Sequence, residues 1–337
     1  MEIKENFSLK AYNTFGIEAQ AKLFSEVNSL EQLKEVYAHY TNEEKLPLGG
    51  GSNLLLTQNF NGLVTKLNLL GKELLKEDEN YVWVKVGAGE VWHEFVVWAV
   101  NNGWSGVENM SLIPGSVGAA PMQNIGAYGS ELKDVFESLE AWLPEENTVE
   151  TFNNSTCDFG YRSSIFKKQL KGKAIILNVN FKLSKQAKPN TSYGSIEEEL
   201  TIMNISAPTI QDISKAVIRI RQSKLPNPAE IGNAGSFFKN PVIPSETANN
   251  LLKKYPNAPN YKVGEGLRKV PAGWLIETAG WKGRTFDGRF GIHKKQALVL
   301  VNYQNTLGQE IFDLSENIIE DIEAKFGIRL EREVNII

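Results

Sequence analysis

The sequence predicts an α+β protein of two or three domains. At 337 residues the chain is longer than one ordinary domain. Segments with the apolar spacing of helices and segments with the alternation of strands both occur along it, with no internal repeat. The composition is globular, with 42% hydrophobic and 23% charged residues. We therefore expect a large hydrophobic core.

Composition and charge exclude several other classes of protein. The net charge of -4 argues against broad nucleic-acid binding, although it permits a local basic pocket. Cys157 is the only cysteine, so an internal disulfide is excluded, and we expect its thiol to be buried. His39, His93 and His293 are too scattered to suggest a metal site. Because no apolar run approaches a membrane span of about 20 residues and no signal-peptide core is present, we expect a cytoplasmic location without membrane insertion.

Helices are predicted where apolar residues recur at helical spacing between capping and stop signals. The expected helices cover residues 29–37, 90–101, 209–224, 245–255, 271–279 and 306–326. Capping pairs are predicted for three of them: Ser29 with Gln32, Thr209 with Asp212, and Thr306 with Gln309.

Strands are predicted at residues 63–67, 81–86, 135–142 and 174–181, and at the C-terminus over 328–337, and residues 291–301 are expected to lead into a strand. A turn at residues 13–16 is expected to anchor the N-terminal arm. In the last strand, alternation places Glu331 and Glu333 on one face. They are either two solvated carboxylates or part of a site.

The sequence GGGSN at residues 49–53 lies between two apolar runs. Three glycines allow backbone N–H groups to converge, as in nests that bind phosphate oxygens. The loop is neither a Walker loop nor a Rossmann turn, because the residues that define those motifs do not follow. An ordinary hairpin turn is the alternative.

Residues 106–129 form a long stretch with five glycines and two prolines, yet with high apolar content. A long irregular segment inside a domain is usually functional. This one would suit a large flat cofactor bound by backbone donors. The alternative is a buried irregular loop without a ligand.

Two further stretches contain candidate catalytic groups. In GNAGSFFKNP at residues 232–241, Gly235 and two phenylalanines would fix the hydroxyl of Ser236 on a tight bend, although a glycine-rich hairpin with core aromatics remains open. Arg162 lies among aromatic and small hydroxyl residues, so we expect it to be partly buried with an anionic partner. That partner is either a structural carboxylate or a substrate anion.

Two further residues lie in segments between predicted elements. Tyr193 lies at the tip of a short loop at residues 192–196. The alternative for this segment is an ordinary surface turn without a functional role. Lys224 lies where a proline-rich segment ends a helix, which indicates a domain boundary. A solvated lysine at a helix end is the alternative for Lys224.

Taken together, the motifs resemble the UDP-N-acetylenolpyruvoylglucosamine reductase family of flavoenzymes. The resemblance extends over nearly the whole chain, from residue 12 to residue 334. It rests on five ordered motifs: GGGSN (49–53), IPGSVG (113–118), QNIGAYG (123–129), FGYR (159–162) and GNAGSFFKNP (232–241). The Tyr193 loop looks like that of the longer subclass of the family, whereas Ser163 departs from the acid that often follows the arginine.

The resemblance implies an FAD-binding fold of the vanillyl-alcohol-oxidase type (PCMH-like) with a separate α+β substrate-binding domain. The implied domains are residues 1–67 with the C-terminal strand 329–337, residues 68–225, and residues 226–328. We also expect a monomeric protein, and the family implies FAD as cofactor, NADPH as co-substrate and no metal.

The family reaction reduces UDP-N-acetylglucosamine enolpyruvate to UDP-N-acetylmuramate in peptidoglycan precursor synthesis. NADPH would reduce FAD and leave, and flavin N5 would then pass hydride to the β-carbon of the enolpyruvyl group. By matching positions, Ser236 would give a proton to the α-carbon, while Arg162 and Glu333 would polarise the carboxylate and stabilise the enol-like intermediate. Glu333 could act in a protonated form only if burial raised its pKa.

Binding residues also follow from the matching positions. The implied substrate contacts are Tyr193, Lys224, Asn240 and Gln296. The implied cofactor contacts are Gly49, Gly50, Gly51, Ser52, Asn53, Ile113, Pro114, Gly115, Ser116, Gly118, Gln123, Asn124, Gly126, Ala127 and Tyr128.

Two other functions are compatible with a flavin fold. One is a sugar or alcohol oxidase, but alcohol oxidation needs a base near flavin N5 rather than a hydroxyl acid. The other is a nucleotide-binding module without catalysis, which would be expected to lose Ser236, Arg162 or Glu333 first. All three are present.

Overall fold

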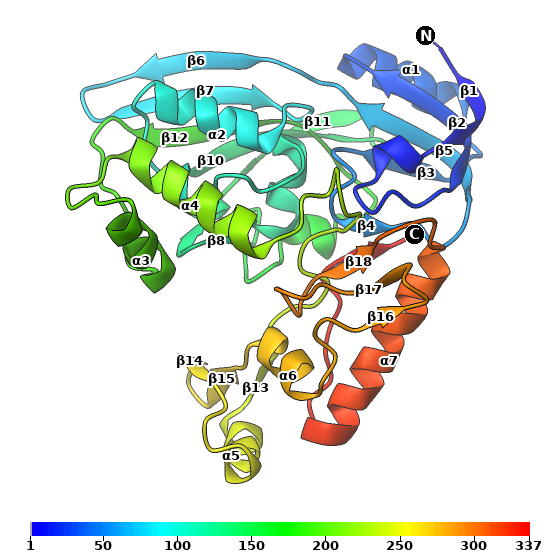
Figure 1. The fold of residues 1–337 in the computed structure, drawn as a ribbon. Coiled ribbons are helices and arrows are strands. Elements are labelled where there is room, and N and C mark those ends of the chain that lie inside the picture. Colours follow the sequence, from blue (N-terminus) through cyan, green and yellow to red (C-terminus); the bar gives the residue numbers. More distant parts are fainter. Residues whose placement is uncertain (1) are drawn as a thin grey trace. The chain divides into compact units, whose positions relative to one another are not determined.

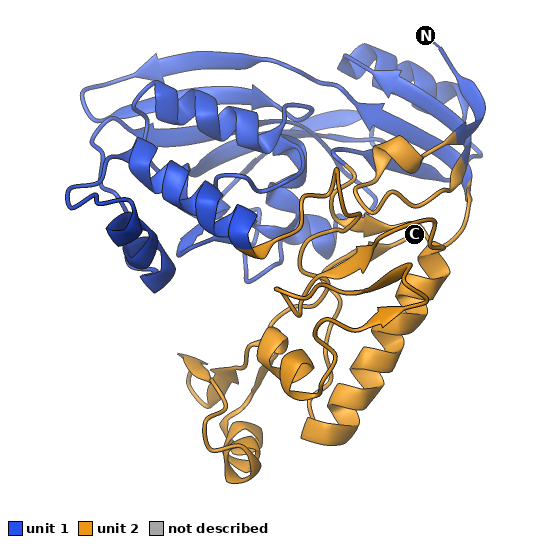
Figure 2. Cartoon of the chain, in the orientation of Figure 1, with its two compact units in different colours: residues 1–7, 21–50, 61–223 blue, residues 8–20, 51–60, 224–337 orange. Residues whose placement is uncertain are grey.

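The computed structural model describes residues 2–337, which divide into two compact units (Figure 2). Unit 1 comprises residues 1–7, 21–50 and 61–223, and unit 2 comprises residues 8–20, 51–60 and 224–337. The boundary at 223/224 is close to the predicted boundary at 225/226. The finer division into three domains stays a prediction.

The first sheet of unit 1 has four strands in the order β1-β2-β5-β3. Their bounds are Lys4–Ser8, Gln20–Val27, Phe60–Leu67 and Lys45–Leu48, respectively. Helix α1 (Leu30–His39) packs its buried face against this sheet, because Leu33, Val36 and Tyr37 share a core with Leu63 and Leu67. Strands β3 and β5 are parallel, with Leu48 opposite Lys66.

The second sheet of unit 1 has five strands, and every neighbouring pair is antiparallel. The order is β11 (Thr148–Asn153), β10 (Phe136–Leu143), β12 (Ile175–Ser184), β7 (Tyr81–Gly87) and β6 (Lys72–Glu77). Helix α2 (Trp92–Asn101) covers it, since Trp92 and Phe95 pack on Phe181 (Figure 1). Helices α3 (Gly194–Ile202) and α4 (Ile210–Lys224) form a smaller core of their own.

Short elements lie between these helices and strands, and four candidate cofactor residues fall within them: Gly118, Gln123, Gly126 and Ala127. These elements are six 3-10 turns among the described residues and a two-stranded ribbon. The turns are η1 (Lys10–Tyr12), η2 (Glu108–Met110), η3 (Val117–Ala119), η4 (Pro121–Gln123), η5 (Leu132–Asp134) and η6 (Ile165–Lys167); the ribbon pairs β8 (Gly126–Ala127) with β9 (Ser130–Glu131).

Unit 2 contains three small sheets and three helices among its described residues. The sheets are β13-β15-β14 (Val242–Pro244, Leu267–Lys269, Tyr261–Gly264), β16-β17-β18 (Thr285–Phe286, Phe290–Ile292, Leu300–Asn302), and the parallel pair β19 (Asn335–Ile336) and β4 (Leu54–Leu55). The helices are α5 (Ser245–Lys254), α6 (Ala272–Thr278) and α7 (Gly308–Phe326). Helix α7 buries Ile311, Leu314, Ile318 and Ile322 at the predicted spacing.

All six predicted helices are present, and the first two capping pairs are confirmed. Asp212 N–H donates to Thr209 Oγ1 at 3.2 Å, and Gln32 N–H donates to Ser29 Oγ at 3.3 Å. Cys157 is fully buried, as expected, and burial raises the pKa of its thiol to about 12. Within residues 2–337, none of the helices combines the length and the apolar character that a membrane span needs.

Three local predictions were wrong. The cap of α7 is not Thr306 with Gln309, because the Leu307 N–H donates to Glu310 Oε2 at 2.9 Å and Leu307 is exposed. The segment 192–196 is not only a loop, because α3 begins at Gly194. The C-terminal strand is limited to Asn335–Ile336 and an isolated bridge at Arg332. In addition, several strands were not predicted, among them β6.

Candidate functional site

The loop that follows β3 lies directly against the start of the 113–118 motif. A Cβ atom built on Gly49 would be 2.4 Å from Ser116 Oγ, and one on Gly50 would be 2.8 Å from Gly115 Cα. At Gly50 the neighbouring atoms are backbone, so a side chain would force one of the two loops to move, whereas at Gly49 the neighbouring atom is the Ser116 hydroxyl, which would have to rotate away. The structure therefore brings together two of the motifs that were predicted to bind the cofactor.

The 113–118 motif is fixed by the residues that enter helix α2. Trp92 N–H donates to the Gly115 carbonyl oxygen at 3.0 Å, and Gly118 N–H donates to the Ala88 carbonyl oxygen at 2.9 Å. A Cβ on Gly118 would lie 2.5 Å from Ala88 Cβ. The backbone of this motif is thus held from one side by β7 and α2, while Pro114 stays exposed.

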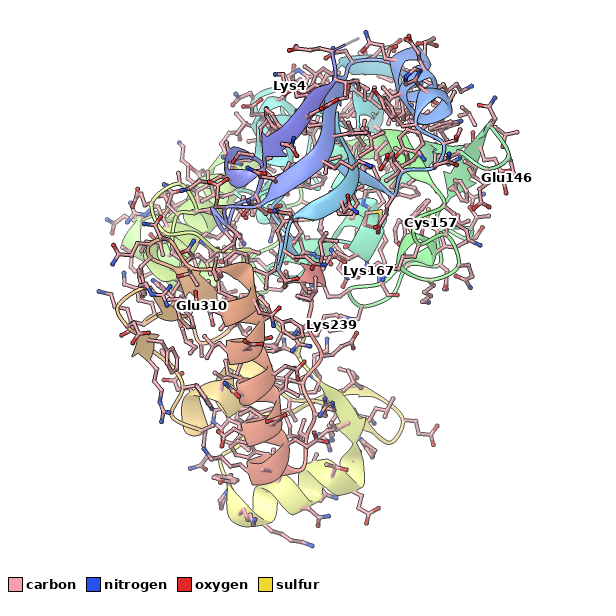
Figure 3. The ribbon with its side chains drawn as sticks, turned by 90° about the vertical axis from the view of Figure 1, so that its right-hand side faces the viewer. Lys4, Glu146, Cys157, Lys167, Lys239 and Glu310 are labelled. Atoms are coloured by element: carbon pink, nitrogen blue, oxygen red, sulfur yellow. The ribbon has the colours of Figure 1, made fainter. Side chains whose placement is uncertain are left out.

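The loop that carries Arg162 is bonded to the third cofactor motif. Arg162 Nη2 donates to the Gly126 carbonyl oxygen at 3.1 Å, and Lys167 Nζ donates to Gln123 Oε1 at 2.9 Å (Figure 3). Asn124 is fully buried. Arg162 is half-buried, as predicted. The loop at residues 122–128 is therefore hydrogen-bonded to the loop at residues 160–167.

Several residues in these loops have left-handed backbone conformations. The φ angles are 59° at Leu112, 45° at Asn124, 49° at Tyr128 and 51° at Arg162. A non-glycine residue in this region costs about 1–2 kcal/mol, and bulky residues adopt it rarely. Strained conformations of this kind persist only where the surrounding structure enforces them, and they cluster at functional sites.

A half-buried cation lies beside the same loops. Arg221, on α4, donates from Nε to the Leu112 carbonyl oxygen at 3.2 Å, and its guanidinium lies close to the Tyr128 hydroxyl. Burial lowers the pKa of the Arg221 guanidinium, and the contact with Tyr128 offsets part of that effect. His93 Nδ1 accepts the Leu112 N–H at 3.0 Å, so Leu112 is held from both its backbone groups.

Tyr193 lies next to Tyr128 in unit 1. The two rings pack edge-to-face with centroids 5.4 Å apart, and Tyr193 remains 52% exposed. Asn109 joins the segments that carry them, because its Nδ2 donates to the carbonyl oxygens of Tyr128 and Asn190, each at 3.0 Å. An exposed aromatic ring is thus attached to the predicted cofactor loop.

In unit 2, the segment that carries Ser236 pairs with the segment that carries Glu333. Glu333 N–H donates to the Phe237 carbonyl oxygen at 2.8 Å, and Lys239 N–H donates to the Glu331 carbonyl oxygen at 2.9 Å (Figure 3 labels Lys239). Gly235, with a φ of 69°, supplies the bend before Ser236. Ser236 and Glu333 are both half-buried.

The end of the GGGSN loop also lies in unit 2, beside Glu333. Asn53 Nδ2 donates to the Glu333 carbonyl oxygen at 3.4 Å, and the Asn53 carbonyl oxygen accepts the Asn335 N–H at 3.2 Å. Gly51 has a φ of 63°, and a Cβ there would lie 2.0 Å from the Tyr12 carbonyl oxygen. A predicted cofactor residue is therefore in contact with the segment of a predicted catalytic residue.

Two predicted substrate residues lie at the start of α6. Asn240 Oδ1 accepts the Ala272 N–H at 2.9 Å, and a Cβ on Gly273 would lie 3.7 Å from Gln296 Oε1. Since the Asn240 oxygen is used in this way, its amide nitrogen is the atom left to contact a ligand. Lys224, at the end of α4, is exposed.

The predicted site residues are divided between the two units. Unit 1 contains Arg162, Tyr193 and the remaining cofactor residues: Gly49, Gly50, Ile113, Pro114, Gly115, Ser116, Gly118, Gln123, Asn124, Gly126, Ala127 and Tyr128. Unit 2 contains Ser236, Glu333, Lys224, Asn240 and Gln296, together with Gly51, Ser52 and Asn53.

Sequence reasoning assigned no role to Lys66, His93, Asn109, Lys167 and Arg221. For Arg221 a signal existed, because it lies one helical turn after Val217 on the apolar face of its helix. A cation on a buried face needs an anionic or polar partner. For Lys66 and Lys167 the sequence carries no comparable signal, since their partners are distant in the chain.

The residues present fit a large anionic cofactor. Glycines packed closely against neighbouring loops allow close backbone approach, and the half-buried guanidinium of Arg221 supplies positive charge. Fold and loops together define an FAD-binding oxidoreductase. Residues 21–151 match the FAD binding domain family, and residues 227–337 match the C-terminal domain of UDP-N-acetylenolpyruvoylglucosamine reductase.

Full-length relatives give the family. The chain is 55% identical to the UDP-N-acetylenolpyruvoylglucosamine reductase of Flavobacterium johnsoniae and 44% identical to that of Pseudomonas aeruginosa, covering 100% of this chain in both cases and 100% and 99% of the relatives. The crystal structure of the Thermus caldophilus enzyme superposes with a TM-score of 0.67 at 25% identity, over 99% of this chain and 98% of that one. The chain belongs to the UDP-N-acetylenolpyruvoylglucosamine reductase family, and the expected fold class and FAD cofactor are confirmed.

Proposed function

We propose that this protein reduces UDP-N-acetylglucosamine enolpyruvate to UDP-N-acetylmuramate with NADPH, in the synthesis of peptidoglycan precursors. The observation that carries the proposal is the pairing of the Ser236 segment with the Glu333 segment in unit 2. It places a hydroxyl donor and a carboxyl group on adjacent strands of backbone. Reduction of an activated alkene needs a proton donor and stabilisation of a developing carboxylate charge.

Bound FAD would supply the hydride, received from NADPH, to the β-carbon of the enolpyruvyl group. The residues of the 49–53 loop would hold its diphosphate through backbone N–H groups. The loops at 113–118 and 123–128 would line it, with the left-handed residues fixing which backbone groups face the ring system. Arg221 adds a cation that the sequence motifs did not reveal.

Ser236 would donate the proton to the α-carbon. Gly235 before it and the buried rings of Phe237 and Phe238 after it fix the position of its hydroxyl. A serine hydroxyl is a weak acid, so the step requires a strongly basic carbon and a site that excludes water. Both conditions hold for the enolate of a carboxylic acid in a closed site.

Arg162 and Glu333 would act on the substrate carboxylate. Arg162 is fixed by its contact with Gly126 and by its left-handed backbone, which orients a planar cation suited to a carboxylate. Glu333 would act with a proton on its side chain only if burial in the site raised its pKa. The longer-subclass role of Tyr193, which would close over the substrate, belongs to the same proposal.

Lys224, Asn240 and Gln296 would hold the sugar nucleotide. The Asn240 amide nitrogen suits a diphosphate oxygen, because its carbonyl oxygen is bonded to Ala272. A monomeric state and a cytoplasmic location are part of the proposal.

The test is to purify the protein, record its visible spectrum, and follow NADPH consumption with and without the enolpyruvyl sugar nucleotide. A yellow protein that oxidises NADPH rapidly only with that substrate is the expected result. Turnover of a sugar or alcohol with oxygen, and none of the enolpyruvyl compound, would instead identify an oxidase. A yellow protein without either activity would point to a binding module.

A further inference from the structure

Lys66 has an unusual position for a lysine on a central strand. It lies on β5 opposite Leu48, the last residue of β3, and its Nζ donates to the Gly49 carbonyl oxygen at 2.7 Å. The side chain is half-buried, and no carboxylate in residues 2–337 forms an ion pair with it. Burial lowers the pKa of the Lys66 ammonium, partly offset by the more distant Glu26.

The contact fixes the direction of the next backbone donor. In a planar trans peptide, the C=O of one residue and the N–H of the next point to opposite sides. Because the Gly49 carbonyl points to Lys66, the Gly50 N–H points away from it. In the described chain this N–H donates to no protein acceptor, and Gly50 is exposed.

A cation on the carbonyl also changes the strength of that donor. Hydrogen bonds that share a peptide group polarise one another, so the N–H becomes a better donor to an anion. The position of this peptide is also limited by residues 115–116, because Gly50 packs against the backbone of Gly115 without room for a Cβ and Gly49 lies against the Ser116 side chain.

We propose that Lys66 is a positioning residue for the cofactor diphosphate: its ammonium orients and polarises the Gly49–Gly50 peptide so that the Gly50 N–H donates to a phosphate oxygen. The inference rests on the proposed placement of the diphosphate at residues 49–53. Lys66 acts through the peptide and does not touch the cofactor.

The test compares Lys66→Met with Lys45→Met in the holoenzyme. Lys45 is a matched control, because it lies on the neighbouring strand β3 and its Nζ also binds carbonyl oxygens, those of Thr41 and Glu43. FAD release is followed by the rise of flavin fluorescence on dilution. Lys66→Met is expected to release FAD about 10- to 100-fold faster, as befits loss of a charge-assisted contact, and Lys45→Met to resemble the parent.

The visible spectrum of the flavin that stays bound separates this role from general loosening. It is expected to be unchanged in Lys66→Met, because the effect is at the diphosphate. Equal release from the two variants, or a displaced flavin spectrum, would overturn the inference. If Lys66→Met does not fold, Lys66→Gln, which keeps a neutral donor, gives the same comparison. A parent protein without bound FAD would contradict the proposed function itself rather than the role of Lys66.

Discussion

The backbone N–H of Glu333 donates to the carbonyl oxygen of Phe237 at 2.8 Å, although the two residues are far apart in the chain. This bond pairs Phe237, the residue after Ser236, with Glu333, to which the family resemblance gives a role in stabilising the enol-like intermediate. A proton donor and a carboxyl group on two hydrogen-bonded segments suit a reaction in which negative charge develops on a carboxylate and is removed by protonation of the neighbouring carbon. The next two predictions test each partner separately.

Ser236→Ala is expected to lower kcat by about 10²- to 10⁴-fold, the usual effect of removing a general acid. The half-reaction in which NADPH reduces the flavin should keep its rate, because Ser236 would act only on the second substrate. Stopped-flow absorbance of the flavin, first with NADPH alone and then with the enolpyruvyl sugar nucleotide, measures both rates. An equal loss in the two half-reactions would assign Ser236 a structural role.

Glu333→Gln retains the size and the backbone bond of Glu333 but removes the carboxyl group. We expect kcat to fall by at least about tenfold, because an amide cannot give or take the proton of a carboxyl group. Glu331→Gln is the control, since Glu331 is exposed and its carboxylate pairs with Lys239. Normal turnover in Glu333→Gln would remove Glu333 from the mechanism.

Asn240→Asp tests the direction of the Asn240 amide. A carboxylate oxygen can still accept the Ala272 N–H, so the start of α6 should be preserved. The substitution replaces the proposed donor to the substrate diphosphate with a negative charge. KM for the sugar nucleotide should therefore rise about 10- to 100-fold, while KM for NADPH should change less. Asn250→Asp makes the same change of charge on exposed helix α5 and should leave both constants near the parent values. A similar rise in the two variants would indicate a general electrostatic effect.

The helices could be predicted from sequence because their apolar residues keep a regular spacing, as in α7. The edge strand β6 could not, because Leu74 and Leu75 are adjacent and both exposed, so no alternation marks the strand. The cap of α7 was misplaced since Thr306 uses its hydroxyl on the Arg289 carbonyl oxygen instead. Local patterns say little about a partner that is distant in sequence.

The same limit explains which parts of the site were found. Glycine at 49 and 50 has a local signature, and its cause, contact with residues 115–116, agrees with the predicted role. His93 has no such signature: it lies on a helix among core residues, and only the fold shows that it accepts the Leu112 N–H. The resemblance supplied the roles of Ser236 and Glu333, which composition and spacing alone left open.

Gly50→Ala should weaken FAD binding strongly. The new Cβ would lie 2.8 Å from Gly115 Cα, so one of the two cofactor loops must move. We expect the affinity for FAD to fall by at least about tenfold. The free energy of unfolding of the FAD-free protein should decrease less, since overpacking costs about 1–3 kcal/mol. Gly194→Ala is the control, because nothing lies within 4 Å of a Cβ there. Fluorescence titration with FAD would contradict the expectation if both variants bound it equally.

His93 should make stability depend on pH in the weakly acidic range. Burial lowers its pKa below the ordinary value of 6.5, and the nearby Arg221 lowers it further, while Glu94 opposes them. A base whose folded-state pKa is depressed binds its proton more readily in the unfolded chain. The free energy of unfolding is therefore unaffected above about pH 6.5, and it decreases as the pH falls from there toward the lowered pKa of the folded state.

His93→Asn isolates this contribution, because the Asn Oδ1 can accept the Leu112 N–H in place of Nδ1 but does not titrate. The decrease in melting temperature between pH 7.5 and pH 5.5 should be smaller in the variant than in the parent. His293, whose pKa is also lowered by burial, contributes equally to both proteins, so their difference reports His93 alone. A difference in melting temperature that stays the same at both pH values would show that the proton on His93 is not involved, and that the variant acts through packing of the loop before Ile113.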